Sequence, residues 1–203
     1  MPAPQPTSVD PLRLHLVVLR CQAGDEQAFA RLHDWFGGRT LAYLRGLLGD
    51  DGEDVQQEVW LTVFRRIGAL SDPGAFRTWL FRTTRHRAID FLRRRRRERE
   101  LLEDPLLRTP DPPAGDEDAS LGASLGASLG ASPNASLPAA GPALAAALAR
   151  LAPAHREVLL LRYEQELSYA ELALVVGCSV GTVRSRLHYA KAHLHALLQG
   201  DTP

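Results

Sequence analysis

Residues 167–198, LSYAELALVVGCSVGTVRSRLHYAKAHLHALL, hold the pattern that decides the fold. Ser168 and Glu171 form the Ser-x-x-Glu signature of a helix start, and Gly177 ends that helix. Ser179 is placed to cap a second helix immediately afterwards. Two helices joined by a turn of three or four residues that contains glycine are typical of a helix-turn-helix. The sequence therefore predicts this motif near the C-terminal end of the chain.

The second helix of the pair combines a buried stripe with a polar start. Apolar residues recur at spacings of four and three, at Val183, Leu187, Ala190, Leu194 and Leu197. The first turns of a recognition helix face base edges in the major groove, where arginine pairs with guanine and a hydroxyl bonds to bases or phosphate. We therefore expect DNA contacts from the residues outside the stripe: Thr182, Arg184, Ser185, Arg186, His188 and Tyr189.

A change of composition divides the rest of the chain. Residues 104–142 contain a tandem Ser-Leu-Gly-Ala repeat and almost no β-branched or aromatic residues. Such a segment buries too little apolar surface to offset the entropy of ordering, so we expect a flexible linker. Residues 1–11, MPAPQPTSVDP, predict a disordered tail. The chain then consists of an N-terminal domain over 12–103 and the helix-turn-helix domain over 143–199, and the predicted fold is all-α.

Two helices of the N-terminal domain have unusual polar surfaces. In the first, Asp54, Gln57, Glu58 and Leu61 form a stripe beside the apolar one. The second, over residues 76–99, carries ten arginines against Asp90 and Glu98, a net charge of +8 in a chain whose 24 basic and 24 acidic residues balance. Arginines interleaved with aromatic rings suit phosphates and unstacked bases, which predicts a surface for melted DNA. For the run 93–97 alone, a solvated basic face is the alternative.

The sequence argues against several functional classes. It has no glycine-rich phosphate loop after a strand, no Cys/His set at metal-ligand spacing and no nucleophile motif, so we expect neither an enzyme nor a bound metal or cofactor. Cys21 and Cys178 are interpreted as small core residues. No signal peptide or membrane-spanning apolar run is recognised, and we expect a cytoplasmic protein without membrane insertion.

The run LSYAELALVVGCSVGTVRSRLHYAKAHL resembles the C-terminal promoter-binding domain of bacterial sigma factors of the extracytoplasmic-function group. GDEQAFARL, EDVQQEVWLTVF and FRTWLFRTTRHRAIDFLRRRRR resemble the N-terminal domain of the same group. The resemblance implies a sigma factor that binds core RNA polymerase, recognises and melts promoter DNA, and starts transcription. The alternative is a helix-turn-helix regulator that acts without core polymerase. Such a regulator needs an effector or dimerisation domain, and this chain has a basic helical unit in that place.

The resemblance also implies roles for individual residues. The polymerase is expected to bind through the clamp helices of its largest subunit and through its flap. The positions matching the clamp-binding site are Asp54, Gln57, Glu58 and Trp60. The recognition-helix residues match the surface that reads the upstream promoter element. An anti-sigma factor is a common partner in the family, although no residue here indicates one.

The family captures a flipped-out base of the downstream promoter element with the turn over 69–75 and the helix that follows. The positions that match this surface are Ser71, Asp72, Phe76, Trp79, Arg82, Arg85 and His86. Phosphate contacts are expected from Arg93, Arg94, Arg95 and Arg96. The family often has Ala-x-Asn where this chain reads Thr84-Arg85-His86, which leaves the preferred downstream sequence open.

Overall fold

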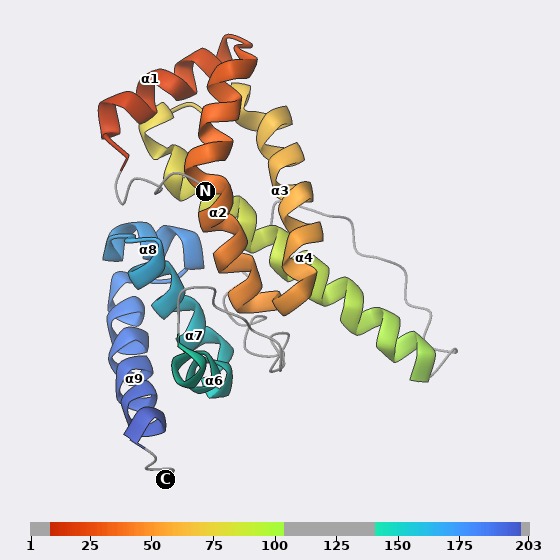
Figure 1. Ribbon diagram of the computed structural model, residues 1–203, viewed down its shortest axis with the longest axis vertical. Helices are drawn as coiled ribbons and strands as arrows, with labels where there is room; N and C mark the ends of the chain where they lie inside the picture. The colour runs from red at the N-terminus through yellow and green to blue at the C-terminus, as the bar shows by residue number, and fades with distance from the viewer. Residues whose placement is uncertain (1–8, 104–140, 200–203) are drawn as a thin grey trace.

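The computed structural model describes residues 9–103 and 141–199, and every regular element within these ranges is helical (Figure 1). Helix α1 (Pro11–Gln22) begins inside the expected tail, because the Asp10 carboxylate caps it and proline loses no hydrogen bond at a first helical position. Helix α6 (Pro142–Arg150) likewise begins at the last residue of the expected linker. Residues 1–8 of the predicted tail and 104–140 of the predicted linker lie outside the described residues.

The N-terminal unit is a bundle of four helices around one apolar core. Helix α2 (Glu26–Leu48) is capped by Asp25, whose carboxylate accepts hydrogen bonds from the Gln27 and Ala28 amides at 2.9 and 3.0 Å. It continues unbroken through Gly37 and Gly38. Short 3₁₀ turns η1 (Gly49–Asp51), η2 (Ile67–Ala69) and η3 (Pro73–Ala75) flank helix α3 (Gly52–Arg66) and lead into helix α4 (Phe76–Glu103).

The C-terminal unit contains the predicted helix-turn-helix. Helices α7 (Pro153–Leu159) and α8 (Tyr169–Val176) are separated by a π-helical turn, η4 (Leu160–Glu164), and α9 (Val180–Gln199) follows. The capping box of Ser168 and Glu171 is present, and Gly177 has the left-handed φ of 71° that ends α8. The Ser179 hydroxyl accepts a hydrogen bond from the Thr182 amide at 3.1 Å. The all-α fold and the helix-turn-helix are therefore confirmed.

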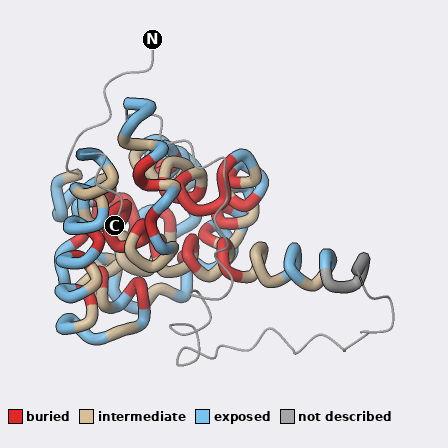
Figure 2. Tube along the Cα trace, turned by 90° about the horizontal axis from the view of Figure 1, so that it is seen from below, coloured by how far each residue is buried: buried red, intermediate tan, exposed pale blue. Residues whose placement is uncertain are grey.

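The two units pack against each other, which the sequence did not predict. Helix α8 lies against α4, and α7 and η4 lie against α2 (Figure 1). Buried apolar residues of both units form one continuous cluster. The C-terminal end of α4 instead protrudes from the body of the molecule (Figure 2). Among the described helices, none is long and apolar enough to cross a membrane.

Candidate nucleic-acid and polymerase interfaces

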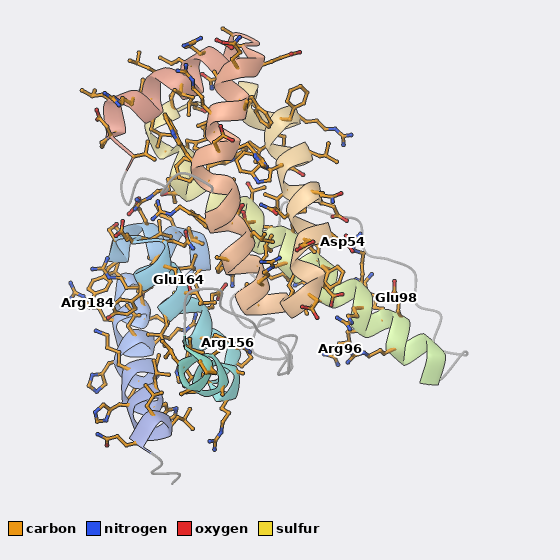
Figure 3. All side chains as sticks on the ribbon, in the orientation of Figure 1. Asp54, Arg96, Glu98, Arg156, Glu164 and Arg184 are labelled. Carbon is orange, nitrogen blue, oxygen red and sulfur yellow. The ribbon has the colours of Figure 1, made fainter. Side chains whose placement is uncertain are left out.

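The start of α9 is presented to solvent. Arg184, Ser185, His188 and Tyr189 are exposed, while Thr182 and Arg186 are half-buried. Figure 3 shows Arg184 on the side of α9 that faces away from the N-terminal unit. The burial of Val183, Leu187 and Ala190 fixes this orientation, because it turns the opposite face of α9 outwards. The predicted upstream-element residues therefore share one accessible surface.

Contacts within the motif hold these side chains in place. The Arg184 guanidinium lies 6.0 Å from the centre of the Tyr169 ring on α8, a distance at which a cation is attracted to the ring face. The Ser185 hydroxyl donates to the Thr182 carbonyl at 3.0 Å and keeps its acceptor capacity. The surface thus offers charged donors and a hydroxyl acceptor, which are the groups that read base edges in a major groove.

Of the residues of α3 expected to contact polymerase, some lie at the surface and one lies in the core. Asp54 and Gln57 are exposed, and Glu58 is half-buried with its carboxylate 3.3 Å from Arg94. Trp60 is only 7% exposed and packs edge-on against Phe29. Three of the four residues are thus accessible, whereas Trp60 belongs mainly to the core.

A groove of about 630 Å³ adjoins the exposed stripe. Its apolar lining includes Leu61 and Phe64, which are 56% and 60% exposed although both are large and apolar. The indole N–H of Trp60, which also lines the groove, has no hydrogen-bond partner within the described chain. Sequence reasoning placed Leu61 on the stripe but missed the groove. The signal for it was the pair of large apolar side chains on the polar side of α3.

The expected downstream-element surface is partly accessible. Ser71 and Asp72 are exposed in the turn before α4, and the Asp72 carboxylate accepts a hydrogen bond from the Gly74 amide at 2.8 Å. Trp79, Arg82 and His86 are half-buried along α4. Burial, together with the positive charges of neighbouring arginines, lowers the pKa of His86. His86 is therefore a neutral imidazole near pH 7 and offers one donor and one acceptor.

Two residues expected on that surface are fully buried. Phe76 is 0% exposed, and its ring centre lies 5.6 Å from that of Phe36 in the core. Arg85 is 1% exposed, and its Nε donates to the Glu157 carboxylate of the C-terminal unit at 2.9 Å. Neither side chain can contact DNA in this arrangement. For Arg85, such a contact requires α7 to move away.

The basic run at the end of α4 is partly neutralised. The Arg94 guanidinium pairs with Glu58, and that of Arg95 pairs with Asp51, so both interact with the first half of α3 and the turn before it. Arg93 is half-buried, and Arg96 is exposed on the protruding part of the helix (Figure 3). Ion pairs between exposed side chains contribute little free energy, so these arginines can exchange a carboxylate for a phosphate.

The fold and these surfaces define a helical DNA-binding protein with a recognition helix in one unit and an arginine-rich helix in the other. Two sigma-70 families match the chain: region 2 over residues 36–98 and region 4 over residues 142–194. The first includes α3 and most of α4, and the second includes the helix-turn-helix. Both predicted domains thus correspond to sigma-factor regions.

Relatives that match most of this chain agree with these family matches. The chain is 30% identical over 195 residues to the ECF RNA polymerase sigma factor BldN of Streptomyces coelicolor, covering 95% of this chain and 68% of BldN. It is also 30% identical over 188 residues to the RNA polymerase sigma-H factor of Pseudomonas aeruginosa, covering 90% of this chain and 92% of that protein. CnrH, solved in complex with the cytosolic domain of CnrY, shares the fold with a TM-score of 0.61 at 24% identity, covering 95% of this chain and 100% of CnrH.

The chain belongs to the extracytoplasmic-function group of sigma-70 family RNA polymerase sigma factors. It is a transcription initiation factor that acts with RNA polymerase, and not an enzyme. Of the two functions that the sequence left open, the sigma factor is the correct one. Its promoter-binding and polymerase-binding roles follow from the presence of both sigma regions.

Proposed function

We propose that the exposed stripe of α3, formed by Asp54, Gln57 and Glu58, binds the clamp helices of the largest polymerase subunit. The observation that carries this proposal is the accessible polar stripe directly beside an apolar groove on the region 2 unit. Stable interfaces combine an apolar centre with a polar rim, and this face offers both. The two carboxylates favour a basic partner surface. The region 4 unit is proposed to bind the polymerase flap.

We propose that the exposed start of α9 reads the upstream promoter element, led by Arg184 and Arg186. The turn with Ser71 and Asp72, and the face of α4 with Trp79 and His86, act on the downstream element once the duplex opens. Arg82 and the arginines at 93–96 neutralise phosphates beside it. Stacking on a ring and hydrogen bonds to a flipped base offset the cost of unstacking it.

The remaining partner and the location are inferred from the family. Two proteins of this fold are solved with a partner: CnrH with the cytosolic domain of CnrY, and the sigma factor RpoE of Bartonella quintana with the anti-sigma factor NepR. We therefore propose that an anti-sigma protein also binds this chain. Because it acts on RNA polymerase, its proposed location is the cytoplasm.

Core-dependent run-off transcription on a genomic library tests the promoter-directed function and reveals the promoter motif. Replacing Gln57 and Glu58 with alanine tests the polymerase surface, since alanine preserves the helix while removing both polar groups. Affinity for core polymerase should fall by about tenfold or more. Arg66→Ala, at an exposed position near the end of the same helix, is the matched control and should leave core affinity unchanged. Equal affinities for the two variants would exclude this face as the polymerase site.

A further inference from the structure

The contact between the two units is built around a buried carboxylate. Glu157 of α7 is 0% exposed, and its Oε1 accepts hydrogen bonds from the Tyr43 hydroxyl and from Arg85 Nε, both at 2.9 Å. Tyr43 comes from α2 and Arg85 from α4, and they are 0% and 1% exposed. A buried charge that loses its partner is strongly destabilised. Loss of any one of the three side chains should therefore weaken the contact between the units.

The Leu160 side chain also lies directly against the α2 backbone at this contact. A Cβ atom added to Gly46 of α2 would lie 2.5 Å from Leu160 Cδ1 of η4, which is closer than side chains pack. The absence of a side chain at Gly46 is what allows η4 to lie directly on α2. Around the edge, Arg77 Nη2 donates to the Glu166 carbonyl at 3.1 Å and to the Glu171 carboxylate at 3.2 Å.

This contact covers part of one proposed DNA-facing surface and leaves the other free. It buries Arg85 in the middle of the α4 surface assigned to the downstream element, whereas Arg184 and Ser185 of α9 remain exposed. A guanidinium that pairs with a carboxylate forms the same charge-assisted hydrogen bonds with a phosphate. Glu157 thus occupies Arg85 in the way that a nucleic-acid phosphate would.

We propose that this closed arrangement is an autoinhibited state of the sigma factor, in which the Tyr43–Glu157–Arg85 contact is the latch. Opening moves α7 and α8 away from α2 and α4. Arg85 then exchanges the Glu157 carboxylate for a phosphate of the downstream element, and water solvates Tyr43 and Glu157. Core polymerase binds the open state. The exchange of the Glu157 carboxylate for a phosphate rests on the role proposed above for α4.

Two variants should open the latch by different physical routes. Glu157→Gln removes the charge but keeps the shape, so Arg85 is left buried without a counter-charge. Gly46→Gln keeps the ionic contact but introduces a side chain that clashes with Leu160, and glutamine is a better helix former than glycine in the open state. Glu166→Gln is the matched control for charge, because Glu166 is exposed at the edge of the same contact, 3.7 Å from Arg39.

Small-angle X-ray scattering of the free full-length protein reports the opening directly. Both latch variants should have a larger radius of gyration than the wild type and Glu166→Gln, with unchanged far-UV circular dichroism. They should also bind core polymerase at least about tenfold more tightly, because the cost of opening has been removed. Wild-type dimensions in both variants would overturn the proposal, as would expansion without any gain in core affinity.

The scattering and polymerase-binding measurements test the latch and the proposed polymerase surface separately. Small-angle X-ray scattering requires no polymerase. Expansion of both variants therefore supports the latch even if the α3 surface does not bind core polymerase. If the radius of gyration of a latch variant increases no more than that of Glu166→Gln, the Tyr43–Glu157–Arg85 contact does not hold the two units together. If Glu157→Gln alone lost helical structure, Gly46→Gln would still decide the question, because it leaves every charged group in place.

Discussion

At the scale of the residue, Glu164 of η4 has a buried carboxylate oxygen without a hydrogen-bond partner in the described part of the chain, and burial raises its pKa from 4.5 to about 6. The folded state therefore binds the proton more tightly than the unfolded state. This group's contribution to stability is greatest below pH 4.5 and is lost as the pH rises through about 6.

Glu164→Gln should therefore raise the free energy of unfolding at pH 7.5 by about 1 kcal/mol, after allowance for the solvent around a partly exposed group. At pH 4.5 the variant and the wild type should be nearly equal. Urea unfolding at the two pH values measures the difference, with the exposed Glu166→Gln as control. A gain of the same size at both pH values would show that the carboxylate charge is not the cause.

Arg184 belongs to the same scale, because its proposed role is one bidentate base contact. Arg184→Ala should weaken specific promoter binding by about 1–3 kcal/mol while changing non-specific binding much less. Lys191→Ala removes one positive charge from an exposed position later in the same helix and should weaken both kinds of binding equally. Fluorescence anisotropy with matched specific and scrambled duplexes measures the ratio. An unchanged ratio for Arg184→Ala would remove it from base recognition.

At the scale of the element, the turn between α8 and α9 depends on Gly177, whose φ of 71° is unfavourable for residues with a Cβ. Gly177→Ala should lower the free energy of unfolding by about 1 kcal/mol, because the left-handed conformation brings its Cβ too close to the following carbonyl oxygen. Gly181→Ala is the matched comparison, since its Cβ would meet only the Ser179 hydroxyl at an ordinary 3.6 Å. This second change should be neutral or slightly stabilising. Thermal unfolding of the two variants measures the difference in stability. Equal losses of stability would show that the left-handed conformation at Gly177 is not the cause.

Helix α4 is proposed to act on DNA after the strands separate. His86→Ala should leave closed-complex binding largely intact but reduce open-complex formation, measured by permanganate reactivity of the downstream element. A template mismatched in that element should restore part of the loss, because the cost of unpairing has already been met. Absence of this rescue would assign His86 a role outside strand separation.

At the scale of the whole molecule, transcription requires the two units to reach promoter elements that lie apart along the DNA. We propose that the predicted linker, most of which lies outside the described residues, supplies this reach through its composition. Deleting residues 124–131, two Ser-Leu-Gly-Ala repeats, should change run-off transcription by less than about twofold, because the reach of a flexible chain varies with the square root of its length. Replacement of the same residues by a Gly/Ser stretch of equal length is the control. A large loss in both variants would indicate that the segment is recognised by a partner.

The local features followed from the sequence because they depend on neighbouring residues. The caps at Ser168 and Ser179 and the glycine at 177 act within one turn of chain, so their residue types were sufficient to place the helix ends. The buried stripe of α9 could also be predicted from the sequence, since a period of about 3.6 residues determines which side of a helix is buried. These features, with the family resemblance, were enough to predict the all-α fold, the recognition surface and the function.

The contact between the two units, and with it the burial of Arg85, depends on residues far apart in the sequence. No local pattern distinguishes an arginine that will bind a phosphate from one that pairs with a glutamate 72 residues further along the chain. The same holds for Phe76 and Trp60, whose burial depends on helices far away in sequence. Helix periodicity and charge are local, so the sequence alone was enough to predict which surfaces bind DNA and polymerase. Which of those surfaces is accessible depends on long-range packing, which places Glu157 against Arg85 and Leu160 against Gly46 and leaves the start of α9 exposed.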